Sequence, residues 1–337
     1  MRGRGGDLRP FRLSLEAEHC EDGCVGGLLL RNTLNAVSAA LPPRNQKDSM
    51  SDRPRIRFNE ATYHCSHTVE LERSLALAAA TFDVEAKYTA ADSVPPLYTA
   101  TTDMEAFFGT LADCIPEGVM TGQNSGAHAE SDVYFHKPLR PGATITWEPV
   151  IRSVLPSPAG ALETMELVYR DETGDPVVTH LWTTIAINAT TDQYGGDSLP
   201  DHKFPDEARE HPLGSESIFV PESQGVAYYE ASGDHALHSR DLEAALAEGF
   251  PGLILQGMCT FGISAAVATR LGGGGDSSRM TRLAARFTSP VLLGHDLTVD
   301  VFEVTSGPDG STEVAFEARQ GDTYCLRHGR AVYALAS

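Results

Sequence analysis

The turn at residues 232–239 holds the side chains best suited to proton transfer. The stretch "SGDHALHS" brings Asp234, His235 and His238 together just ahead of the apolar run "GFPGLILQGMCTFG" (249–262). A carboxylate beside imidazoles can take a proton from water and return one to carbon, and the ordinary histidine pKa suits both steps. An aspartate after glycine also caps a following helix routinely. The turn alone therefore admits two interpretations, a proton-transfer site and a helix cap.

Other reactive residue types form weaker patterns. The stretch "HCEDGC" (19–24) has no second cluster at zinc-finger spacing, and we expect no metal site there. Cys259 is expected to pack as a small apolar group, and His128, His136 and His180 to be structural or exposed. Glycines 272–275 end an apolar run and precede no Lys-Ser or Lys-Thr pair, unlike a phosphate-binding loop. The sequence therefore predicts neither a metal nor another cofactor.

The composition is that of a globular protein with a strong negative charge. The chain has 337 residues, 41% of them hydrophobic, which is enough for two domains. A net charge of -20 repels phosphates, so neither nucleic acid nor an acidic membrane surface is an expected partner. The arginines at 279, 282 and 286 are expected to form a solvated charged face. Six scattered cysteines without a secretory segment predict a reducing, cytoplasmic location.

The elements that must position the turn follow the same order in both halves of the chain. Helical patterns at 68–83 and 103–113 precede β-branched and aromatic runs from 129 to 187, whose turn signals are typical of antiparallel strands. The second half repeats this order, with helices over 221–234, 239–250 and 253–271 and then strands from 280 to 335. The helix at 253–271 is apolar but interrupted by polar residues, which favours a buried helix over a membrane span.

Individual residues repeat as well. The stretches "FHKPLRPGATIT" (135–146) and "FTSPVLLGHDLT" (287–298) share phenylalanine, proline, glycine and threonine at a constant offset of 152. A match at the same place in the same element order indicates a duplicated fold. We divide the chain into an extension (1–54), an N-terminal repeat (55–192), a linker (193–215) and a C-terminal repeat (216–337).

A long apolar helix wrapped by an antiparallel sheet, occurring twice, resembles the double hotdog fold of the MaoC-like or hydratase 2 proteins. The resemblance covers about residues 55 to 337 and is sharpest in "SGD" (232–234), "GFPGLILQGMCTFG" and "RFTSPVLLGHDLT". It implies an α+β fold and reversible hydration of an α,β-unsaturated acyl thioester, with a non-catalytic N-terminal repeat. It also implies Asp234 and His238 as proton-transfer residues, and the Gly257 N–H as donor to the enolate oxygen. The residues expected to bind substrate are His235, Ser239, Phe250, Gln256 and Met258.

The turn departs from the motif G-D-x-N-P-x-H of that family, and two registers stay open. Without a gap, Ala236 and Ser239 replace the asparagine and the catalytic histidine. With a turn one residue shorter, His238 takes the histidine position and His235 that of the asparagine. Gln256 stands where the family commonly has histidine. The two registers predict opposite activities.

Three functional hypotheses follow. The first is a hydro-lyase that interconverts trans-2-enoyl and (R)-3-hydroxyacyl thioesters, with CoA as the preferred carrier. The second keeps the fold but reassigns the cavity to a cyclase, isomerase or aldol-type reaction of secondary metabolism. The third is non-catalytic acyl binding. The expected partner is a small acyl thioester, and the chain is expected to be a monomer or a homodimer.

Overall fold

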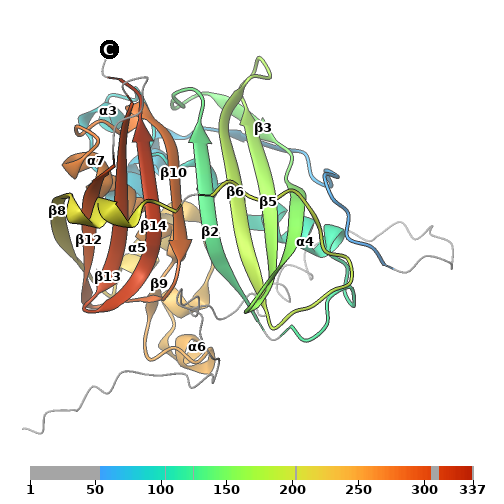
Figure 1. Ribbon diagram of the computed structural model, residues 1–337. Coiled ribbons are helices and arrows are strands. Elements are labelled where there is room, and N and C mark those ends of the chain that lie inside the picture. Colours follow the sequence, from blue (N-terminus) through green and yellow to red (C-terminus); the bar gives the residue numbers. More distant parts are fainter. Residues whose placement is uncertain (1–53, 103, 124, 202, 305–310, 336–337) are drawn as a thin grey trace, which may run out of the picture.

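A twelve-stranded antiparallel sheet forms the frame of the molecule. The computed structural model describes residues 54–335 with gaps at 103, 124, 202 and 305–310. The expected N-terminal extension, all but its last residue, lies outside the described residues, as do Cys20 and Cys24. Figure 1 shows the strands of the second half (orange to red) beside those of the first half (green), with the helices behind them.

The two halves have the same strand order. The strands of the first half are β1 (Cys65–Thr68), β2 (Ser125–Phe135), β3 (Thr144–Trp147), β4 (Val150–Ser157), β5 (Gly160–Arg170), β6 (Pro176–Ile187) and β7 (Gly195–Gly196). Those of the second half are β8 (Pro212–Val220), β10 (Met280–Phe287), β12 (His295–Val304), β13 (Thr312–Gln320) and β14 (Thr323–Tyr333). The order β1-β3-β5-β6-β2 meets β10-β14-β13-β12-β8, so each half is a copy of the other and β2 pairs with β10 at the seam. The duplication predicted from the sequence is confirmed.

Cross-strand ion pairs strengthen this seam. Arg282 donates to both carboxylate oxygens of Asp132 at 2.9 and 2.7 Å, and Arg286 donates to Glu130 at 2.7 Å. The expectation of a solvated arginine face is therefore wrong for these two residues. Their side chains are only 18% and 20% exposed, because the pairing of β10 with β2 brings acidic partners opposite them.

The helices occupy one face of the sheet. They are α2 (Leu71–Ala80), α3 (Ala86–Thr89), α4 (Met104–Cys114), α5 (Gln224–Ser232), α6 (Leu242–Ala247) and α7 (Gly257–Leu271), with short 3-10 turns η1 (Thr99–Thr101), η2 (Asp206–Glu210), η3 (Leu237–Ser239) and η4 (Ser277–Arg279). The central helix α7 is buried on every side, since its small and apolar residues let strands wrap closely around it. None of the described helices is long and apolar enough to cross a membrane.

The start of α7 differs from the prediction. The helix begins at Gly257 and not at Leu253, because Ile254–Leu255 form a short strand β9 that pairs with β11 (Val291–Leu292). The Pro-Gly turn at residues 141–142, one of the turn signals between the predicted strands, is not a hairpin turn. It joins β2 to β3, which are not neighbours in the sheet. The turns near residues 159 and 173 do join paired strands.

The segment between the halves packs against the second half. Phe204 and Ala208 form a small apolar cluster with Ala315. The 3-10 turn η2 (yellow in Figure 1) lies on the face of the sheet opposite the α-helices. Arg209 donates to both oxygens of the buried Glu317 at 3.1 and 2.8 Å. Strands β7 and β8 begin within the segment expected to be a linker, and its limits (193–215) stay a prediction.

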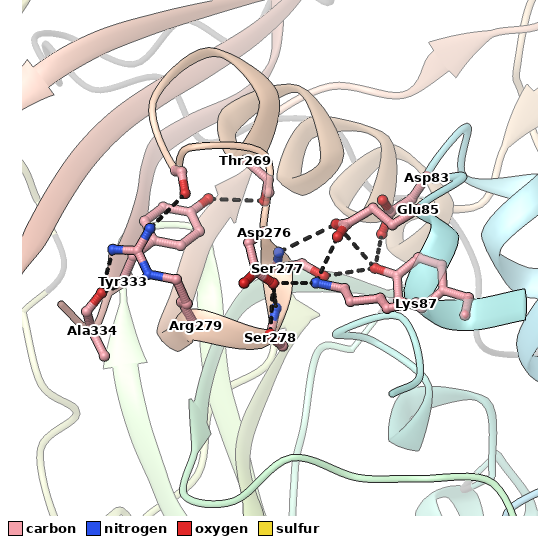
Figure 2. Close-up of polar contacts among 12 residues, drawn as sticks. Asp83, Glu85, Lys87, Thr269, Asp276, Ser277, Ser278, Arg279, Tyr333 and Ala334 are labelled. Carbon is pink, nitrogen blue, oxygen red and sulfur yellow. Dashed lines mark hydrogen bonds and ion pairs between the residues drawn. The ribbon is translucent and has the colours of Figure 1, made fainter. Parts of the chain in front are cut away.

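A polar network ties the first half to the end of α7 (Figure 2). The hydroxyl of Tyr88 lies 2.7 Å from both the Asp83 carboxylate and the Ser277 hydroxyl. Lys87 bridges Glu85 and Asp276 at 2.6 and 2.5 Å. Asp83 is only 5% exposed, and this burial raises its pKa from 3.8 to about 6.

We predict that Asp83→Asn stabilises the protein at neutral pH. In the wild type, burial disfavours the ionised Asp83 carboxyl in the folded state. The free energy of unfolding therefore falls as pH rises from 3.8 toward about 6. The amide oxygen still accepts from Tyr88 but carries no charge, which removes a cost of up to about 3 kcal/mol. Urea unfolding at pH 7 should show a gain that vanishes below pH 4. An equal loss of stability at both pH values would contradict this assignment.

Candidate active site

The predicted proton-transfer turn opens into a cavity of about 690 Å³ between the two halves. The second half contributes the turn, residues 254–258 and Phe287. The first half contributes mainly apolar and aromatic walls, from Met104, Phe107, Phe108, His128 and Trp182. A polar turn facing a long apolar wall suits a ligand with a reactive head and a hydrocarbon tail.

The end of helix α5 fixes the turn. Gly233 has φ 74° at the C-cap of α5, a conformation that glycine adopts without strain. The Asp234 N–H donates to the Ser232 hydroxyl at 3.1 Å, and the Asp234 carboxylate accepts from the Ala236 N–H at 3.0 Å. Asp234 therefore forms an Asx turn, whereas the N-cap of η3 is Ala236 without a side-chain cap bond, and Asp234 also lines the cavity.

The electrostatic surroundings of Asp234 suit a proton acceptor. Burial raises the pKa of its carboxyl, while the Ala236 N–H and the charges of His238 and His235 act in the opposite direction. The charge of His238 acts more strongly than that of His235. A carboxylate with a raised pKa is a stronger base toward a bound water than an exposed one.

Arg73, on helix α2 of the first half, secures the turn from the other side. Its guanidinium donates to the carbonyls of Ala231 and Ser232 at 3.1 and 2.8 Å, and also to that of Thr101. These carbonyls at the end of α5 have no acceptor role inside the helix, and a cation near a helix C-terminus is favourable. The first half thus orients the turn that carries Asp234.

His238 lies in the cavity wall, and Ser239 lies behind it. The His238 Nδ1 is 2.8 Å from the Glu248 carboxylate, and its ring meets Phe250 edge-on at 5.5 Å. Ser239 is fully buried and does not line the cavity; its hydroxyl bonds to the Ala236 carbonyl and accepts from Gln256 at 2.9 Å. The arrangement supports the register with the shorter turn, in which the histidine and not the serine meets the ligand.

The other expected ligand-binding residues lie around the same cavity. His235 is exposed at the mouth, with its ring 5.1 Å from Tyr229. Phe250, Gln256 and Met258 line the wall. Gln256 is buried and donates to the Gly225 carbonyl at 3.1 Å as well as to Ser239. Its amide nitrogen therefore links α5 and the turn η3 to the start of α7.

Gly257 begins helix α7 at the cavity wall. As the first helical residue, it has an N–H without an acceptor in the helix, and the helix dipole adds partial positive charge there. A Cβ at this position would come within 3.2 Å of the Phe287 ring. Close packing against Phe287 therefore favours glycine at this position, and a helix start at a cavity wall is the place where an oxyanion site is expected.

His128 is a cavity residue that sequence reasoning missed. It is stacked between Trp182 and Phe287 at 4.6 and 4.0 Å, and its Nε2 lies 3.0 Å from the Ser131 hydroxyl, which also contacts His180 at 3.0 Å. Burial lowers the pKa of His128 well below its ordinary value, so the ring is neutral. No spacing in the sequence marked it, because the cavity wall forms only when β2 pairs with β10.

Metal ligation finds no support in the geometry of this cavity. Over residues 54–335, apart from the gaps named above, no three histidine, cysteine or acidic side chains converge as a metal site. Cys259 is fully buried in α7, and burial raises the pKa of its thiol well above the ordinary range. The arrangement can hold an acyl group and move protons.

Comparisons with known proteins agree with this architecture. A MaoC-like dehydratase from Phytophthora capsici superposes with a TM-score of 0.68 at 22% identity, covering 83% of this chain and 98% of that one. A Mycobacterium tuberculosis protein described as a double hotdog fold superposes with a TM-score of 0.51 at 15% identity, covering 80% and 93%. The fold is therefore the double hotdog, as predicted.

Sequence comparison finds a known domain in the second half of the chain. Residues 203–323 match the model of the MaoC like domain. The chain is 33% identical to 3-hydroxyacyl-thioester dehydratase Y of Mycobacterium tuberculosis over 31% of its own length and 35% of that protein. It is 28% identical to a probable enoyl-CoA hydratase 2 of Dictyostelium discoideum over 41% and 47%. The second half therefore contains a MaoC-like domain, and the chain spans less than half the length of each of these two relatives.

We predict that Arg73→Met loosens the turn. Methionine keeps the length of the side chain but leaves three carbonyls without their donor, which should lower the free energy of unfolding by about 3 kcal/mol. Thermal unfolding measures this loss, and Arg73→Lys should restore only part of it because an ammonium group lacks the planar fork. Unchanged stability in Arg73→Met would show that the turn is held by other contacts.

Proposed function

We propose that this chain is a hydro-lyase that interconverts trans-2-enoyl and (R)-3-hydroxyacyl thioesters. The observation that carries the proposal is that Asp234 and His238 line one cavity, whose wall includes the half-buried helix start at Gly257. The MaoC-like domain and the named relatives support a hydration or dehydration reaction. The exact reaction and its stereochemistry are our proposal.

In the hydration direction, Asp234 accepts a proton from a water molecule as the water oxygen adds to the β-carbon. The electrons of the double bond move toward the thioester, and the resulting enolate oxygen is stabilised by the Gly257 N–H. Protonated His238 then delivers a proton to the α-carbon, which completes the addition. Proton exchange with solvent returns both groups to their starting states, and dehydration follows the same steps in reverse.

The shape of the cavity supports an acyl thioester as substrate. The aromatic wall from the first half, with Phe107, Phe108 and Trp182, can receive a hydrocarbon chain. The thioester then lies near Gly257, and its carrier extends past the exposed His235 toward solvent. We propose CoA as the carrier, because an acidic carrier protein would be repelled by a chain with net charge -20.

We predict that His238→Gln lowers hydration of crotonyl-CoA far more than Ser239→Ala does. Loss of a general acid or base costs about 100- to 10,000-fold in rate, and we expect this range for His238→Gln and for Asp234→Asn. Ser239→Ala removes only a contact behind the wall and should cost less than about tenfold. The loss of enoyl absorbance measures each rate.

The same assay separates the two registers of the turn. If Ser239→Ala is as damaging as Asp234→Asn while His238→Gln is active, the serine and not the histidine occupies the catalytic position. Inactivity of the wild type over many acyl chain lengths would remove the hydration proposal itself.

A reassigned cavity is the second candidate function. The specific observation in its favour is that Ser239 and Gln256, which stand where the family has histidines in the ungapped register, bond to each other at 2.9 Å. Such a cavity could run a cyclase or isomerase reaction or bind acyl groups without turnover. The proposals of a cytoplasmic location and of a monomeric or homodimeric state rest on the sequence alone.

A further inference from the structure

The carboxylate of Glu248 is buried beside the proposed acid. Only 8% of its side chain is exposed, and one oxygen lies 2.8 Å from His238 Nδ1. The residue forms the C-cap of helix α6, whose end is closed by hydrogen bonds from its own N–H to Ala244 and from Gly249 to Leu246. A buried carboxylate is costly unless it is paired, so this contact is a built feature of the fold and not a surface encounter.

The contact fixes the chemical state of the imidazole. A carboxylate oxygen can only accept a hydrogen bond, so Nδ1 of His238 carries the proton and Nε2 is the nitrogen left for the cavity. Phe250 packs edge-on against the same ring and limits its rotation.

The altered motif explains why such a group is needed. His238 precedes Ser239, which occupies the position of the family's catalytic histidine when the motif is aligned without a gap. Ser239 bonds to Gln256 and does not line the cavity. A histidine on the short turn η3 has no regular helix to set its direction. A carboxylate from the end of α6 supplies that direction.

We propose that Glu248 is a positioning residue that orients His238 and holds a proton on its Nδ1, so that Nε2 is directed toward the cavity for proton delivery to the α-carbon. This inference rests on the proposed hydro-lyase function. Glu248 does not line the cavity and acts only through the imidazole. The other charged or titratable groups that line the same cavity are Asp234, His235, Arg73, Glu105, His128 and Cys325.

The test compares Glu248→Gln with Glu243→Gln in the full chain. Glutamine keeps the volume and an acceptor oxygen at position 248 but removes the charge, whereas Glu243 is exposed on the same helix and serves as the matched control. We expect Glu248→Gln to lower kcat for crotonyl-CoA by about 10- to 100-fold with KM nearly unchanged, because the binding groups stay in place. Glu248→Asp, which keeps the charge, should restore part of the rate.

A second measurement needs no turnover. The nitrogen chemical shifts of the neutral His238 ring, read by NMR, report which ring nitrogen carries the proton. We expect the form protonated on Nδ1 in wild type and in Glu243→Gln, and a mixture of both forms in Glu248→Gln, because a glutamine amide can donate as well as accept. The same form in Glu248→Gln as in wild type, together with a wild-type kcat, would overturn the inference.

The two proposals fail in different ways. An inactive wild type in which Glu248→Gln still changes the tautomer of His238 removes the hydro-lyase function, while it upholds the pairing and its effect on the ring. An active wild type whose kcat and His238 tautomer are both unchanged in Glu248→Gln removes the positioning role and leaves the hydro-lyase function standing.

Discussion

The pairing of β2 with β10 is the constraint on which the site depends. It joins two copies of one fold into a continuous sheet and sets their helices facing each other. Its half-buried ion pairs, Arg282 with Asp132 and Arg286 with Glu130, fix the register of the two strands. Without this seam, neither the aromatic wall of the first half nor the polar turn of the second would enclose a cavity.

The two copies have diverged in the parts that surround the ligand. The second half keeps a long buried helix, α7, whose first residue offers an N–H to the cavity. The corresponding helix of the first half, α4, is shorter and contributes Phe107 and Phe108 to the wall. One copy therefore provides polarity and the other provides apolar space, while Arg73 of the first half holds the turn of the second.

Sequence reasoning reached the fold because its signals were local and repeated. Glycine and proline at matching positions, and strands in one order twice, needed no contact information to be recognised. The start of α7 was misplaced because Ile254 and Leu255 are apolar in either state, and only their pairing with β11 makes them a strand. Asp234 and His238 were predicted through the motif, and both line the cavity. Glu248 was not predicted, because its contact with His238, ten residues away, exists only in the folded chain. His128 was not predicted as a cavity residue, because its ring neighbours Trp182 and Phe287 come from other strands.

The site also illustrates how a changed motif can retain a proton-transfer geometry. In the register with the shorter turn, His235 stands at the asparagine position of the family motif, and His238 stands at the histidine position, one residue before Ser239. What remains is a carboxylate whose pKa is raised by burial, an imidazole bonded to a second carboxylate, and a helix start that can bind an oxyanion. These are the physical requirements of hydration, met by a different set of neighbours.

Incubation of the full chain with crotonyl-CoA in deuterium oxide tests the central claim most directly. We predict 3-hydroxybutyryl-CoA that carries a single carbon-bound deuterium at the α-carbon and has the R configuration at the β-carbon, as read by mass spectrometry and chiral chromatography. If crotonyl-CoA is recovered unchanged after incubation with the folded protein, the result would contradict the account.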